Sequence, residues 1–332
     1  MPSRTEMARD DGAVVPTAST PPPTRAARLP GFVRFPLLIV LSLTTSLSLL
    51  SAASGFIDPQ LREVSRSSNE DVRVLSSIAW KLTELSLAWF GNFDDIDLIA
   101  LSVLTHAPWY YLLYTFYAVE PTTIGICLSI DALSLAGPTR LLRARAPAHN
   151  PRAPRAAVPN RAIISDAQTA LATSLLGASV YGVALFASLQ TFLPAFMTVH
   201  FDALPTLAGA HAANLPFLVA SLLPVGLAAR EFVLVPGLAA SSTSGDAKRK
   251  AFNPETAGLR EHFVHNFWWF GPGARALIKR TATLTVLTAA HSFVHASTVL
   301  AGGDQVGAAG YSAVWVVGGL VTGLVYAWVE NV

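Results

Sequence analysis

The sequence predicts an all-α integral membrane protein: a polytopic bundle of six to eight transmembrane helices, with one or more amphipathic helices at the membrane interface. Of its 332 residues, 52% are hydrophobic and only 13% are charged, whereas average soluble domains carry about 25% charged residues. Apolar segments long enough to cross a bilayer recur along the chain. One soluble core cannot bury this much apolar surface, but lipid can solvate the outside of each helix.

The N-terminal segment, residues 1–31, is rich in Pro, Ala, Ser, Thr and Arg and has no apolar periodicity. This composition predicts a disordered cytoplasmic tail. The first apolar run, about 35–56, is long enough to span the membrane. The polar region before it is much longer than that of a signal peptide, so we expect an uncleaved signal anchor.

Residues 69–90 form an amphipathic pattern in which Lys81 and Glu84 share the polar face. A helix of this kind either lies at the membrane interface or spans the membrane with those two side chains turned inward. The acidic group that follows, Asp94, Asp95 and Asp97, is expected to be a solvated helix entry, where carboxylates suit the positive end of the helix dipole.

Six further apolar segments have spanning length, and the prolines and glycines between them predict their limits. These spans are expected at about 97–118, 122–138, 166–193, 213–229, 281–300 and 310–329. The residues from 32 to the C-terminus therefore form a single transmembrane domain. Its cytoplasmic loops are 139–161 and 230–280, and the second of these contains an aromatic interfacial helix near 253–270.

Arginines and lysines indicate the orientation, because they are enriched on the cytoplasmic side of membrane proteins. They cluster in the tail and in both predicted cytoplasmic loops, whereas the connectors 196–211 and 301–309 contain none. Both termini are thus expected in the cytoplasm. Six spans result if the segments 69–90 and 122–138 lie at the interface, and eight if both cross. The endomembrane system, in particular the endoplasmic reticulum, is the default location.

Asp131 is the leading candidate for chemistry, because it lies within the apolar segment 122–138. A carboxylate in the membrane costs about 2.5–3.5 kcal/mol on insertion scales, so it needs a partner or a role. A protonated carboxylic acid in a dry cavity can act as a general acid. Glu120, at the turn before this segment, is a second acid that could face the same cavity; the competing interpretation is that both acids face water.

Histidines and aromatic residues complete the candidate site. His106 is a third catalytic candidate, and a wall of aromatic residues for substrate binding follows it on the same predicted helix: Trp109, Tyr110, Tyr114 and Tyr117. Ring faces can stabilise a developing cation. His291 and His295 lie four residues apart on one helix face and are weak candidates for metal ligands. The simpler interpretation of all these residues is packing and hydrogen bonding between helices.

Three functions fit this pattern. The first is an intramembrane enzyme without a cofactor that starts the cyclisation or isomerisation of a lipid-soluble, isoprenoid-like substrate with a proton. In size and number of spans the chain resembles the small polytopic terpene cyclases, without a matching motif. The second is a transporter or channel for protons or a small solute. The third is a non-catalytic membrane organiser whose basic loops bind anionic lipid. The net charge of +2 gives no reason to expect nucleic acid as a partner, and the single cysteine, Cys127, excludes an intrachain disulfide.

Overall fold

The computed structural model describes residues 30–65, 70–154, 157–202, 204–241, 252–253, 255–262 and 271–331. Throughout these residues the regular structure is helical, and the β-type contacts are two isolated bridges. The expected tail lies almost entirely outside the described residues, as do 263–270 of the expected interfacial helix.

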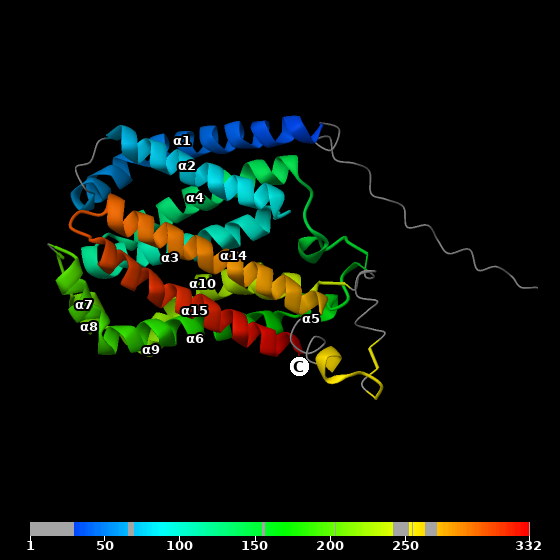
Figure 1. Ribbon diagram of the computed structural model, residues 1–332. Coiled ribbons are helices and arrows are strands. Elements are labelled where there is room, and N and C mark those ends of the chain that lie inside the picture. Colours follow the sequence, from blue (N-terminus) through cyan, green and yellow to red (C-terminus); the bar gives the residue numbers. More distant parts are fainter. Residues whose placement is uncertain are drawn as a thin grey trace, which may run out of the picture.

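Four long helices form the first half of the bundle: α1 (Gly31–Val64), α2 (Glu70–Phe90), α3 (Asp95–Tyr117) and α4 (Pro121–Leu142). Figure 1 shows them running back and forth along one common direction, with α1 at the edge of the bundle. α3 begins with a capping box, in which the Asp94 side chain accepts from the N–H of Asp97 and the Asp97 side chain accepts from the N–H of Asp94. α3 is the most deeply packed of the four.

The second half contains three long helices, α6 (Ala167–Thr191), α14 (Pro272–Val294) and α15 (Gln305–Asn331), and several shorter ones. The shorter helices are η2 (Pro147–His149), α5 (Arg161–Ser165), α7 (Leu193–His200), α8 (Ala208–His211), α9 (Leu215–Ser221), α10 (Leu223–Ala229), η4 (Arg230–Leu234), α11 (Val235–Leu238) and η6 (His295–Val299). η4 and η6 are π-helical turns that continue α10 and α14.

Five helices of the described chain are long and apolar enough to cross a membrane: α1, α3, α4, α6 and α15. A sixth candidate is the pair formed by α9 and the segment 223–238, which are bent by 55° relative to each other. α14, where we expected a span at 281–300, is less apolar because threonines and histidines interrupt it. α4 continues past its predicted end at 138 to Leu142, with Pro138 inside the helix.

α2 and α4, whose placement the sequence left open, both run along the bundle beside α1 and α3 (Figure 1). Lys81 and Glu84 of α2 are buried, so the polar face of this helix is turned into the protein. α4 is among the helices that are long and apolar enough to cross a membrane and α2 is not, so the choice between six and eight spans stays a prediction.

The helices meet at two ends of the bundle, which we call the charged end and the pocket end. At the charged end, the entry to α3 lies close to the residues after α4, because Arg145 binds Asp95. α5 begins beside the end of α11, because the Asn160 side chain donates to the carbonyl of Leu238, at 3.1 Å. At the pocket end, the N–H of Ala301 donates to the last carbonyl of α1, that of Val64.

Glycines allow close helix contacts in the second half. A Cβ on Gly226 of α10 would collide with the backbone of α6 at Ser174 and Ala178. A Cβ on Gly323 of α15 would collide with Thr281 of α14. The small-residue pair Gly319 and Gly323 therefore serves packing within this chain.

Candidate functional site

Polar side chains from four helices meet inside the bundle and form what we call the central polar cluster. α2 contributes Lys81 and Glu84, α3 His106 and Tyr110, α4 Asp131 and Ser134, and α14 with η6 His291 and His295. Four of the residues selected from the sequence as site candidates thus lie together with His106: Tyr110, Asp131, His291 and His295.

Asp131 finds its partner on the neighbouring helix α3. The hydroxyl of Tyr110 donates to Oδ2 of Asp131 at 2.6 Å, and Nε2 of His106 lies 3.8 Å from the same oxygen. The carboxylate side chain is 26% exposed, so it is neither fully enclosed nor freely solvated. A carboxylate held by a phenol and an imidazole satisfies the demand for a partner that its position in an apolar helix creates.

The rings of the three histidines lie next to one another in tilted contacts. The ring centroids of His106 and His291 are 4.1 Å apart, and those of His291 and His295 are 3.9 Å apart. Nδ1 of His106 lies 2.8 Å from the carbonyl oxygen of Ser102; because a carbonyl only accepts, this nitrogen carries the hydrogen. Among the described residues these histidines form no group that could share a metal ion.

Lys81 and Glu84 belong to the cluster, although the sequence singled them out only as the polar face of α2. Nζ of Lys81 donates to Oγ of Ser134 at 2.5 Å, and that hydroxyl donates to the carbonyl of Asp131 at 3.0 Å. Lys81 is 8% exposed and Glu84 2%. The spacing of three residues, which places both on one helix face, was the signal that could have assigned them to the site.

The other predicted site residues lie outside the cluster or at its edge. The Trp109 ring packs against His295, with centroids 5.4 Å apart. Tyr114 is exposed, and Tyr117 lies at the pocket end. Glu120 is exposed just before α4, where its N–H donates to the Gln60 side chain, about 16 Å along α4 from Asp131 at 1.5 Å per residue. The structure does not bring the two acids together.

Most residues of the central polar cluster are buried, and Asp131 is partly exposed. The two clearest pockets of the described chain are lined by other residues: one is a shallow hollow on the outer face of α2, and the other lies at the pocket end. The cluster can therefore join α2, α3, α4 and α14 through polar contacts, which suits its position between helices. Neither of these two pockets is lined by Asp131.

The charged end contains a second polar group, and here the expectation of a solvated acidic helix entry is wrong. Asp94 is 2% exposed and Asp97 is fully buried. Asp97 binds the guanidinium of Arg280 through both carboxylate oxygens, at 2.5 and 3.1 Å. Asp95 is held in the same two-oxygen manner by Arg145. The acids are buried because arginines from α14 and from the segment after α4 cover them.

The segment after α4 is fixed at the charged end by its cations. Arg143 caps the end of α2: its guanidinium donates to the carbonyls of Ala88, Trp89 and Phe93 at 2.9–3.0 Å. Cations are favourable at this position because helix C-termini carry partial negative charge. At least three of the basic residues in the predicted cytoplasmic loop 139–161 thus have partners within the protein.

His149 and Asp94 form a buried pair, with Nδ1 of the imidazole 2.8 Å from Oδ2 of the carboxylate. Burial lowers the pKa of His149, but the hydrogen bond to Asp94 and its charge outweigh burial, so the pKa is raised. Burial raises the pKa of Asp94, but His149 and the N–H groups of Asp97 and Ala146 outweigh it, so this pKa is lowered. Both directions favour a charged pair.

Asp94, Asp97 and His149 also lie close enough to hold a metal ion. Each already has partners in the protein: Asp97 has Arg280, and Asp94 has His149 and the N–H of Ala146. The set is therefore explained as part of the ion-pair network of the charged end.

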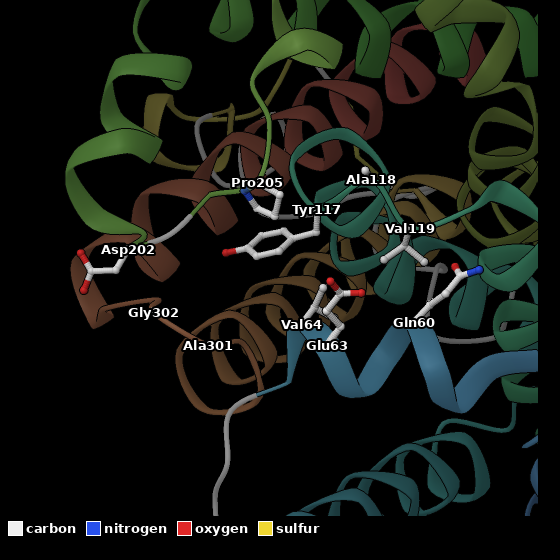
Figure 2. A pocket seen from close by; sticks show the side chains of 10 residues that line it. All are labelled: Gln60, Glu63, Val64, Tyr117, Ala118, Val119, Asp202, Pro205, Ala301 and Gly302. Atoms are coloured by element: carbon white, nitrogen blue, oxygen red, sulfur yellow. The ribbon is translucent and has the colours of Figure 1, made fainter.

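A pocket of about 590 Å³ opens at the pocket end. Figure 2 shows it between the last turn of α1, the end of α3 and the segments at 202–205 and 301–302. Tyr117, which the sequence analysis assigned to a substrate-binding wall, lines this pocket. In the structure, His200 pairs with Asp304 at 2.9 Å, and Asp202 lines this pocket.

Comparison with known proteins gives one match. No curated protein and no solved structure matches the chain. Residues 166–329, which run from the start of α6 almost to the end of α15, match the family model described as the Bouquet formation protein 3 C-terminal domain. This region is slightly less than half of the chain, and it includes His291 and His295 of the central polar cluster but none of its residues from α2, α3 and α4.

Proposed function

We propose that this protein is a multi-pass membrane protein with a non-catalytic organising role. That role would be in bouquet formation, the process after which the matched family is named. The observation that carries this proposal is the match of residues 166–329, which covers α6 and the helices that follow it, except the last residues of α15. The name of the family describes the formation of an arrangement and no chemical reaction, so it favours the organiser over the enzyme and the transporter.

The packing of the central polar cluster supports this proposal. Hydrogen bonds link α3 to α4 through Tyr110 and Asp131, and α2 to α4 through Lys81 and Ser134. Such bonds contribute about 0.6–2 kcal/mol each between helices in a membrane. Under this proposal the cluster keeps the helices in register, and the surface of the bundle presents the binding sites for partners.

An intramembrane acid catalyst is the second candidate, because Asp131 lies beside both a phenol and an imidazole. This grouping suits proton transfer. Neither of the two pockets described above is lined by Asp131.

Gene replacement in the source organism separates the two candidates. Deletion of the gene is expected to abolish bouquet formation, and Asp131→Asn is expected to restore it, because an amide oxygen still accepts from Tyr110. An acid catalyst would lose its function with this variant, since an amide cannot donate the catalytic proton. The amount of protein in the membrane fraction is measured for each strain, and Ser129→Ala, on the exposed face of the same helix, is the control.

Normal bouquet formation in the deletion strain would refute the organiser. Loss of function in an Asp131→Asn strain that contains the normal amount of protein would favour the acid catalyst instead.

We also propose that the charged end faces the cytoplasm of an endomembrane and that its remaining basic residues contact anionic lipid. Cysteine labelling from one side tests the orientation, because Cys127 is the only native cysteine. In a Cys127→Ser background, a cysteine at Arg152 should react from the cytoplasm, and one at Val306 should react only from the other side. Both positions are exposed. The reverse labelling pattern would refute the orientation.

A further inference from the structure

Among the described residues, the two acidic side chains that line the pocket have no ion-pair partner. Two carboxylates line the pocket, Glu63 of α1 and Asp202 after α7, and its described lining contains no Lys, Arg or His. The nearest arginine in sequence, Arg62, is an ion-pair partner of Asp58 at 3.2 Å. The lining is thus complementary to a cation.

Two helix ends add to this field. α1 ends at Val64 and α3 ends at Tyr117, and both residues line the pocket. A helix C-terminus carries a partial charge of about −0.5, which favours a cation within its last turn. Some of the terminal carbonyls are used inside the protein: Val64 accepts from Ala301, and Leu113 accepts from Ala118 and Val119. The negative ends of both helix dipoles nevertheless point toward the pocket.

Tyr117 places an unpartnered polar atom in the same pocket. Its side chain is buried, with 7% of the residue exposed, and its hydroxyl oxygen has no hydrogen-bond partner among the described residues. Figure 2 shows this hydroxyl and the Glu63 carboxylate turned into the space between α1, α3 and the 202–205 segment. A buried hydroxyl without a partner is costly, and the ring beside it offers a face on which an organic cation can rest.

We propose that this pocket binds an organic cation of the alkylammonium class, with its charged nitrogen between the Glu63 carboxylate and the Tyr117 ring. The lining combines two carboxylates, two helix ends and an aromatic ring, a set that suits an organic cation. The volume of about 590 Å³ lies within the range of small-molecule sites. A free amine and the trimethylammonium headgroup of a membrane lipid offer the same chemistry.

Titration of the purified full-length chain tests the proposal. The protein is held in dodecyl maltoside, which contains no ammonium group, and tetramethylammonium chloride is added in a calorimeter, with sodium chloride as the salt control. Saturable binding is expected. Glu63→Gln should weaken it at least tenfold, and Asp202→Asn severalfold. Tyr117→Phe should weaken it about twofold to fivefold, because it removes the hydroxyl and keeps the ring.

Glu120→Gln is the matched control, since it removes a carboxylate at the same end of the bundle that does not line the pocket. A second arm adds phosphatidylcholine or phosphatidylglycerol and measures the retained lipid by native mass spectrometry. Tetramethylammonium binding that depends on Glu63 assigns the site to a free amine. Selective retention of phosphatidylcholine that depends on Glu63, without binding of the free cation, assigns it to a lipid headgroup.

Two results would overturn the proposal: wild-type protein that binds neither probe, and equal binding by the Glu63→Gln and Glu120→Gln variants. Circular dichroism and gel filtration confirm that each variant is folded. Because Glu63 is exposed, its substitution leaves the packing of the bundle intact, so a loss of binding reports on the pocket itself.

Discussion

The two ends of the bundle treat acidic side chains in opposite ways. At the charged end, Asp95 and Asp97 are buried and each is held by an arginine through both oxygens. At the pocket end, Glu63 and Asp202 line an open pocket whose described lining holds no basic residue. The acids of the charged end are neighbours in the sequence and are paired with arginines, whereas those of the pocket end come from distant segments and line a pocket without a described basic residue.

This difference separates acids that stabilise the fold from acids that are available to a ligand. A buried carboxylate requires its partner, and removal of the partner leaves a charge that is strongly destabilising. An exposed carboxylate without a partner contributes little to stability. Substitution of a charged side chain at the charged end should therefore destabilise the protein, whereas substitution of one at the pocket end should leave it folded.

The largest effect is expected for Arg280→Ala. This variant leaves the fully buried Asp97 without its partner, and it also removes contacts of the guanidinium with the rings of Phe93 and Phe232. Loss of one partner of a buried ion pair costs about 3–5 kcal/mol. Thermal unfolding of the full chain in detergent measures the change.

Arg140→Ala is the control for this variant, because Arg140 is 52% exposed and its nitrogen lies 3.9 Å from Asp95. It should cost less than about 1 kcal/mol. Equal losses for the two variants would show that burial of the ion pair is not what matters.

His149→Gln should remove a pH dependence. The pKa of His149 is raised in the folded protein, so its contribution is fully present below the ordinary histidine pKa of about 6.5 and is lost as pH rises through the raised value. The lowered pKa of Asp94 keeps the pair charged until pH falls below the ordinary aspartate range. Hydrogen bonds to charged groups contribute about 1.5–3 kcal/mol.

The difference in unfolding free energy between wild type and His149→Gln should therefore be largest near pH 6 and shrink toward pH 9. Unfolding curves at several pH values measure it. His211→Gln, an exposed histidine of α8 at the other end, should show a constant difference close to zero. A gap for His149→Gln that grows with pH would contradict the charged pair.

Gly302→Ala should cost about 1–2 kcal/mol, the usual penalty for a non-glycine residue in the left-handed region. Gly302 has a φ of +80°, and an added Cβ would collide with the backbone of Asp202. Because both residues line the pocket, the variant should also weaken tetramethylammonium binding. Gly125→Ala, in α4 with nothing near its added Cβ, should be neutral or stabilising.

The smallest effect is expected for Glu63→Gln, within about 0.5 kcal/mol of wild type. The matching substitution at the charged end, Asp97→Asn, removes the same charge but leaves Arg280 buried without its ion-pair partner. It should be destabilising by several kcal/mol. Similar stabilities for the two variants would remove the distinction between the ends of the bundle.

The long helices could be predicted from the sequence because each is a continuous apolar run with breakers at its limits. Their exact course could not. Gly137-Pro138 predicted an end for α4, but the helix continues to Leu142, where buried Thr139 and Leu142 and the contacts of Arg143 hold it. The segment 213–229 was expected to be one span, whereas the structure divides it into α9 and α10, with Pro224 at the start of α10 beside the 55° bend.

Most residues of the candidate site could be predicted from the sequence, but the contacts between them could not. His106, Asp131, His291 and His295 were notable from the sequence because each is polar within an apolar run, and the structure brings them together. The ion pairs could not be foreseen, since Arg280 and Asp97 are separated by 183 positions. No local spacing connects them. The same holds for the pocket, which joins four segments that are distant in the sequence.

The hydrogen bonds of α4 bear on the order in which the chain enters a membrane. His291 is synthesised 160 positions after Asp131, so α4 must leave the ribosome long before α14 exists. Asp131 does not have to wait, because Tyr110 is on the preceding helix, and Lys81 reaches Ser134 from α2. Asp131 and Ser134 of α4 can thus find their partners as soon as the first four helices are together, whereas Asp97 of α3 acquires Arg280 only when α14 arrives.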